Sequence, residues 1–66
     1  MRVSFNGKPR ETKEGATLSA LLEEAGVDPR RAAVALNGKV VPRGDLAATA
    51  PTDGDSIEVI EPVGGG

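Results

Sequence analysis

The chain has 66 residues, with 8 basic and 10 acidic side chains, a formal net charge of −2 and a single aromatic residue. This composition argues against nucleic-acid binding, which uses basic patches and stacking aromatic side chains. Histidine and cysteine are absent from the sequence, so the commonest general base, thiolate chemistry and cysteine-based metal sites are excluded. Because no apolar run approaches the roughly 20 residues of a membrane span, we expect one cytoplasmic domain with no membrane partner.

The first predicted element is a β-hairpin. Apolar and polar residues alternate from Met1 to Asn6, which is the period of a half-buried strand. Asn6-Gly7 suits a tight hairpin turn, because both residues tolerate positive φ. The return segment, residues 8–13, is polar and contains Pro9, so we expect it at an edge of the sheet.

One helix is predicted, from Thr17 to Ala25. Its apolar residues recur at i, i+3, i+4 and i+7 and form a single stripe of Leu18, Leu21, Leu22 and Ala25. Thr17 is suited to the N-cap, Gly26 to the left-handed position after the helix, and Pro29 prevents the helix from continuing.

The second half of the chain predicts three more strands, at residues 32–36, 39–41 and 56–61. Asn37-Gly38 indicates a second hairpin turn between the first two of them. Residues 43–50 are expected to be irregular, with a short turn that buries Leu46. A dense cluster of turn residues at 51–55 precedes the last strand.

The element order β-β-α-β-β-β favours an α+β fold with a mixed sheet of about five strands and the helix on one face. The first and last strands are the most apolar, so we expect them side by side in the centre. This arrangement is the β-grasp, or ubiquitin-like, fold. We expect the folded domain to span residues 1–62 and a flexible glycine tail to occupy residues 63–66.

The glycine tail is the main candidate for chemistry. The sequence finishes Val63-Gly64-Gly65-Gly66. Glycine adds no packing surface and loses the most backbone entropy on folding, so a fold gains nothing from this ending. A chain without Cβ atoms is narrow enough to enter the active site of another protein. We therefore expect the carboxylate of Gly66 to react, while Val63, Gly64 and Gly65 thread into the partner's site.

Strand alternation also predicts a docking surface. If Val34 lies in the core, its neighbours Ala33 and Ala35 point away from the helix. Alternation in the last strand turns Ile60 outward as well. Ala33, Ala35 and Ile60 would then form a small apolar patch, and exposed patches of this kind mark partner sites.

Other polar residues are interpreted structurally. Both Asn-Gly pairs, at Asn6 and Asn37, are assigned to turns rather than to sites. Asp53 and Asp55 carry two carboxylates without further ligands nearby, which is typical of a turn before a strand and not of a metal site.

Five segments carry a family resemblance: Phe5-Asn6-Gly7, the helix start from Thr17 to Leu22, the run from Val34 to Arg43, the run from Asp53 to Val59, and the tail from Val63 to Gly66. In this order and at this chain length they resemble the ThiS/MoaD ubiquitin-like family. The run from Asn37 to Arg43 favours its ThiS branch, the sulfur carriers of thiamin biosynthesis. Pro62-Val63 is similar to the tail of the other branch, the small subunit of molybdopterin synthase.

The resemblance implies a carrier acted on by enzymes, and not an enzyme. A ThiF-like, E1-like adenylyltransferase would adenylate Gly66, using ATP and Mg²⁺ that it binds itself. A sulfur-donor protein would then supply sulfur for a thiocarboxylate, and a ThiG-like thiazole synthase would receive that sulfur. No cofactor is expected on this chain, which has no phosphate-binding loop.

Three alternatives remain open at this point. The chain could donate sulfur to molybdopterin, it could be a ubiquitin-like modifier joined to lysines, or it could be an interaction domain whose tail is inert. The first two share the adenylation of Gly66 and differ in what the activated tail reacts with.

Overall fold

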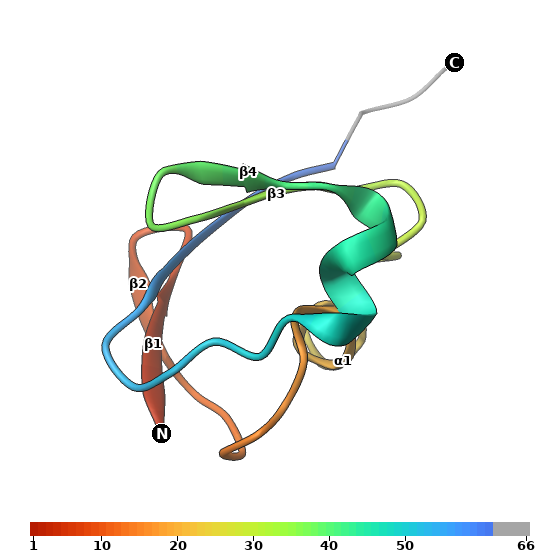
Figure 1. Cartoon of the computed structure of the whole chain (residues 1–66). Helices are drawn as coiled ribbons and strands as arrows, with labels where there is room; N and C mark the ends of the chain where they lie inside the picture. The colour runs from red at the N-terminus through yellow and green to blue at the C-terminus, as the bar shows by residue number, and fades with distance from the viewer. Residues whose placement is uncertain (62–66) are drawn as a thin grey trace.

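The computed structural model describes residues 1–61, which contain five strands, one α-helix and one 3₁₀ helix (Figure 1). The elements are β1 (Arg2–Phe5), β2 (Lys8–Glu11), α1 (Leu18–Glu24), β3 (Ala33–Leu36), β4 (Lys39–Val41), η1 (Arg43–Ala48) and β5 (Ser56–Ile60). The predicted order is confirmed, with strand ends shifted by one or two residues. The exception is η1, a regular 3₁₀ helix where the sequence suggested irregular chain.

The five strands form one sheet in the order β2-β1-β5-β3-β4. β5 lies in the centre and runs parallel to β1, while the three other neighbouring pairs are antiparallel. This is the mixed sheet of the β-grasp fold, and the predicted adjacency of the first and last strands is confirmed. β2 is an edge strand, as Pro9 indicated, because proline cannot donate to a second neighbour.

Two helices cover one face of the sheet, and Figure 1 shows the teal η1 coil beside α1 on that side. The core between the helices and the sheet consists of Val3, Leu18, Leu21, Leu22, Ala32, Val34, Leu46 and Ile57. Leu46 contributes from η1 and is only 2% exposed, so its predicted burial is confirmed. The backbone N–H of Leu18 donates to the carbonyl of Thr49 at 2.8 Å, which ties the start of α1 to the chain after η1.

The ends of α1 follow from its capping residues. The hydroxyl oxygen of Thr17 accepts a hydrogen bond from the N–H of Ala20 at 3.1 Å, and this satisfies one of the free donors of the first turn. Ala25 is the C-cap, and Gly26 follows it with φ of +83°. In the described part of the chain, no helix is both long enough and apolar enough to cross a membrane.

Both hairpin turns have the predicted chemistry. Asn6 and Asn37 each have φ of +51°, and the glycine after each also has positive φ. Two successive residues with positive φ make the tight turn whose twist matches that of the strands. The turns therefore set the register, with Phe5 opposite Lys8 in one hairpin and Leu36 opposite Lys39 in the other.

Candidate functional site

The face of the sheet that lies opposite the helices carries the predicted docking residues. Ala33 is paired with Ile60 across β3 and β5, and Ala35 is paired with Glu58. Directly opposed residues share a face, and alternate residues along a strand share it too. Between them, Val34 is buried on the helix side. The structure thus brings Ala33, Ala35 and Ile60 together on one face, as alternation predicted.

Val40 is a member of this surface that the sequence analysis missed. It lies opposite Ala35 in the β3–β4 hairpin, and its side chain is 79% exposed. Ile60 is 71% exposed, and within residues 1–61 these two are the exposed large apolar side chains. The Asn37-Gly38 turn contained the signal, because a two-residue turn pairs the second residue before it, Ala35, with the second residue after it, Val40. We call Ala33, Ala35, Val40 and Ile60 the open-face patch.

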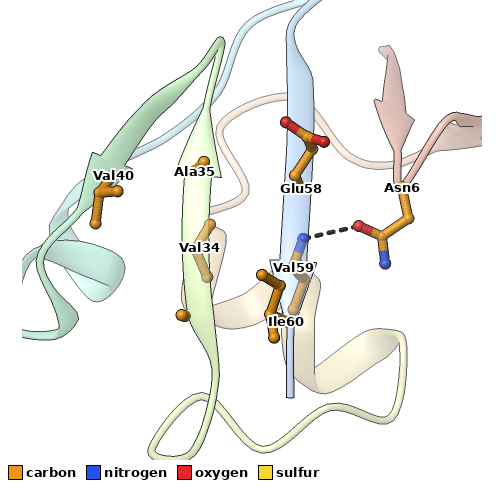
Figure 2. Close-up of a pocket in the computed structure, with 8 residues that line it drawn as sticks. Asn6, Val34, Ala35, Val40, Glu58, Val59 and Ile60 are labelled. Atoms are coloured by element: carbon orange, nitrogen blue, oxygen red, sulfur yellow. Dashed lines mark hydrogen bonds between the residues drawn. The ribbon is translucent and has the colours of Figure 1, made fainter. Parts of the chain in front are cut away.

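The open-face patch surrounds a shallow hollow, shown in Figure 2. Val40 and Ile60 flank β3, and the small alanine side chains between them leave the space. The lining residues are Asn6, Ala33, Val34, Ala35, Val40, Glu58, Val59 and Ile60. Glu58 adds one carboxylate beside the apolar side chains, so a partner surface with apolar side chains and a nearby cation would match it.

Asn6 has a second role, a contact with β5, that its assignment to a turn did not predict. Its backbone N–H donates to the carbonyl of Ile57 at 2.9 Å, and its side-chain Oδ1 accepts from the N–H of Val59 at 2.7 Å (Figure 2). The residue therefore shapes the turn and also binds the central strand. Local sequence contains no sign of this second contact, because Val59 lies 53 positions away.

Asn37 binds the opposite end of β5. Its Oδ1 accepts from the N–H of Ser56 at 2.8 Å, and its Nδ2 donates to Asp55 at 3.1 Å. The other oxygen of Asp55 accepts from the backbone N–H of Thr52 at 2.8 Å. The bond from Thr52, together with that from Asn37, lowers the pKa of Asp55, since both stabilise the ionised form.

The two aspartates of the turn are thus used structurally. Asp53 Oδ1 accepts from the backbone N–H of Arg2 at 2.7 Å, while Asp55 binds Thr52 and Asn37. Within residues 1–61, no set of three or more histidine, cysteine or acidic side chains gathers that could hold a metal ion. Asp55 is therefore hydrogen-bonded within its own turn and to the β3–β4 turn, and Asp53 is hydrogen-bonded to the start of β1.

The residues expected to carry the chemistry, Val63, Gly64, Gly65 and Gly66, lie outside the described residues. What the structure does describe is the strand that leads to them. Ile60, the last residue of β5, stands two positions before Pro62 in the sequence and belongs to the open-face patch. The open-face patch and the segment that leads to the tail therefore share one strand.

Comparison with known proteins assigns the family. The model of the ThiS family matches residues 3–66. The chain belongs to the ThiS family. The sulfur carrier protein ThiS of Escherichia coli is 33% identical over 66 residues, which cover 100% of both chains. The crystal structure of thiamine biosynthesis protein ThiS from Geobacter metallireducens is 37% identical, with a TM-score of 0.77 and 100% of each chain covered.

The ThiS-family resemblance drawn from the sequence is thereby confirmed, and so is the β-grasp fold. A different kind of relative is the thiazole synthase of Paramagnetospirillum magneticum, which is 41% identical over 66 residues. The match covers 100% of this chain but 20% of that protein, so the chain spans a fifth of the length of this relative. A protein named thiazole synthase therefore contains a segment similar to this ThiS-family chain.

Proposed function

We propose that this chain is a sulfur carrier that donates sulfur for thiazole formation in thiamin biosynthesis. The observation that carries the proposal is the family match over residues 3–66, together with a ThiS sulfur carrier of E. coli that aligns along the full length of both chains. The β-grasp domain presents the tail, and the carboxylate of Gly66 bears the sulfur. In this scheme the chain is a co-substrate of its partner enzymes.

The chemistry needs an activating step. A C-terminal carboxylate has a pKa of ~3.3–3.7, so it is an anion near neutral pH and a poor acyl donor. Adenylation by an E1-like partner, with ATP and Mg²⁺ bound to that partner, turns the carboxylate into an acyl-AMP and releases pyrophosphate. Sulfide (HS⁻) released by a donor protein then attacks the acyl carbon. A C–S bond forms, the bond to AMP breaks, and Gly66 becomes a thiocarboxylate.

The chain's own contribution is docking and reach. The open-face patch supplies an apolar surface for the activating enzyme, since burying apolar area is the main driving force of such association. Four residues, Val63 to Gly66, would reach ~13–14 Å if fully extended, at ~3.3–3.6 Å per residue. That length is sufficient to leave a docked surface and enter a neighbouring pocket, and glycines 64–66 add no side chains to its width.

Thiazole synthase is the acceptor that we favour. The supporting observation is the relative in which a ThiS-like segment occurs within a protein named thiazole synthase. Fusion of a carrier to the enzyme that it serves would replace a transient encounter by a high effective concentration. Transfer to molybdopterin and conjugation to lysines begin with the same activated tail and are separated by experiment.

Intact-mass measurement tests the proposal. The protein is incubated with ThiF-like activating enzyme, ATP, Mg²⁺ and a sulfur-donor protein, and a variant lacking Gly66 is the control. Replacement of one oxygen by sulfur in the wild type alone supports the carrier. Larger lysine-linked products would indicate a modifier, and an unchanged mass with competent partners would indicate an inert tail.

A second step identifies the acceptor. The thiocarboxylated protein is mixed separately with thiazole synthase and its substrates, and with the large subunit of molybdopterin synthase and its precursor. Loss of sulfur from the carrier with formation of thiazole product supports the proposal. Transfer in the second mixture only would assign the chain to molybdopterin instead.

A further inference from the structure

The end of β5 extends beyond its parallel neighbour. β1 is paired with β5 only at Ser56 and Ile57. After Phe5, the partner of Ile57, the chain leaves β1 and enters the first hairpin turn. On its other side, β5 is paired with β3 as far as Ile60. The last residues of β5 therefore have a strand on one side only, and β1 leaves the N–H of Val59 without a backbone acceptor.

The side chain of Asn6 supplies that acceptor. Its backbone N–H donates to the carbonyl of Ile57, and its Oδ1 accepts from the N–H of Val59 at 2.7 Å. With φ of +51°, the backbone at Asn6 departs into the turn while the amide stays beside β5, as Figure 2 shows. The amide oxygen thus stands in for the next carbonyl of β1 and continues the ladder by one bond.

We propose that Asn6 is a positioning residue, whose amide holds the end of β5 and so directs the tail toward the active site of the activating enzyme. The inference rests on the proposed function of the tail. Val59 lies only four positions before Val63, where the expected tail begins. Restraining the last residues of β5 reduces the backbone freedom that is lost when the tail enters a partner's site. Asn6 acts through β5 and needs no contact with the reacting atoms.

Asn37 provides a matched control within the same protein. It has the same φ of +51°, precedes a glycine in the other hairpin turn and also binds β5 through Oδ1. Its acceptor contact, however, is to Ser56, at the opposite end of the strand. Loss of the Asn37 side chain should therefore weaken the fold without loosening the end of β5 that leads to the tail.

The experiment compares Asn6→Gly, Asn6→Asp and Asn37→Gly with the wild type. Glycine removes the amide and accepts positive φ without strain, whereas aspartate keeps an acceptor oxygen. Amide hydrogen exchange is followed at Val59, relative to Leu21 in α1. The rate of thiocarboxylate formation is measured against carrier concentration, so that kcat and KM for the activating enzyme are obtained separately.

We expect Asn6→Gly to speed exchange at Val59 and to lower kcat, each roughly fivefold, as the loss of one hydrogen bond implies, with KM little changed. KM is spared because Asn6 only borders the hollow, and the apolar side chains of the open-face patch are unchanged. Asn6→Asp should restore both quantities, and Asn37→Gly should leave both near the wild-type values. A general loss of stability would not produce this division between kcat and KM.

Each contrary outcome has its own meaning. Unchanged exchange at Val59 in Asn6→Gly would overturn the restraint itself. Faster exchange with an unchanged kcat would overturn the role in presentation, as would an equal fall of kcat in Asn37→Gly. If the wild type gains no sulfur with competent partners, the proposed function fails, and the positioning role in transfer fails with it.

Discussion

Asn37 and Ser56 lie 19 positions apart, yet Oδ1 of Asn37 accepts a hydrogen bond from the backbone N–H of Ser56 at 2.8 Å. The same amide donates through Nδ2 to the carboxylate of Asp55 at 3.1 Å. One side chain in the β3–β4 turn therefore holds both the start of β5 and the turn that precedes it. This contact therefore ties the β3–β4 hairpin to the start of the central strand.

Replacing Asn37 by glycine should lower the free energy of unfolding by about 1 kcal/mol, the net value of the exposed hydrogen bonds that are lost. Glycine keeps the positive φ of the turn, so backbone strain does not contribute. Urea unfolding measures the change, and Lys39→Ala, an exposed substitution in the same hairpin, serves as the control. Equal stability of Asn37→Gly and the wild type would show that the contact has no net value.

The stability that depends on Asp55 should be lost in acid. The hydrogen bonds from Thr52 and Asn37 hold the pKa of Asp55 below its ordinary value of 3.8. For a carboxyl whose pKa is lowered by folding, the contribution is present above the ordinary value and is lost as the pH falls through the folded pKa. Wild type should therefore exceed Asp55→Asn in stability near neutral pH, and the two should converge below pH 3.8.

Urea unfolding across that pH range measures the convergence. Glu14→Gln, at an exposed position in the loop before α1, controls for the removal of one negative charge. A constant difference between wild type and Asp55→Asn at all pH values would mean that the ionised form of Asp55 is not what stabilises the turn.

Ile60→Asp should weaken binding to the activating enzyme about tenfold or more, because burial of an isoleucine side chain contributes ~1.5–3 kcal/mol. Its effect on folding should be about 0.5 kcal/mol or less, since the side chain is 71% exposed. Titration calorimetry and urea unfolding measure the two quantities. Ala47→Asp adds the same charge at an exposed position of η1, on the helix side of the sheet, and should bind normally.

Val40→Asp extends this test to the residue that the structure added to the open-face patch. It should behave like Ile60→Asp, because Val40 flanks the same hollow. Normal affinity of both variants would place the docking surface elsewhere on the domain.

Gly65→Val should abolish sulfur transfer while folding is retained. A β-branched side chain would widen the tail and restrict its φ and ψ. Folding should be retained because the substitution leaves the core of the described residues, 1–61, unchanged in sequence. Intact mass after incubation with the activating enzyme, ATP and a sulfur donor gives the readout, and circular dichroism confirms the fold. Normal thiocarboxylate formation by this variant would exclude the steric explanation.

Most of the element order could be predicted because its signals are local. The Asn-Gly turns at Asn6 and Asn37 set the hairpins, Thr17 caps the helix, and alternation orients β3 and β5. The η1 helix was missed because a 3₁₀ turn has a short period and little propensity signal. Only the burial of Leu46 indicated that this segment had to approach the core.

The candidate site was predicted in part. Alternation placed Ala33, Ala35 and Ile60 on one face. The hollow, however, is lined by residues of β3 and of both its neighbours, so its extent could be seen only from the strand pairing. Val40 could have been added from the turn register alone. The glycine tail was recognised from composition, and its role in sulfur transfer stays a prediction for the mass measurement.

The sequence by itself determined the hairpins, the single amphipathic helix, the family and the tail as the candidate for chemistry. Each of these depends on residues that are neighbours in the sequence or on residue type alone. Only the tertiary structure decided that Asn6 and Asn37 each hold one end of β5. The physical reason is that an asparagine in a turn always offers its amide. What accepts or donates to that amide depends on which distant strand the fold places beside it.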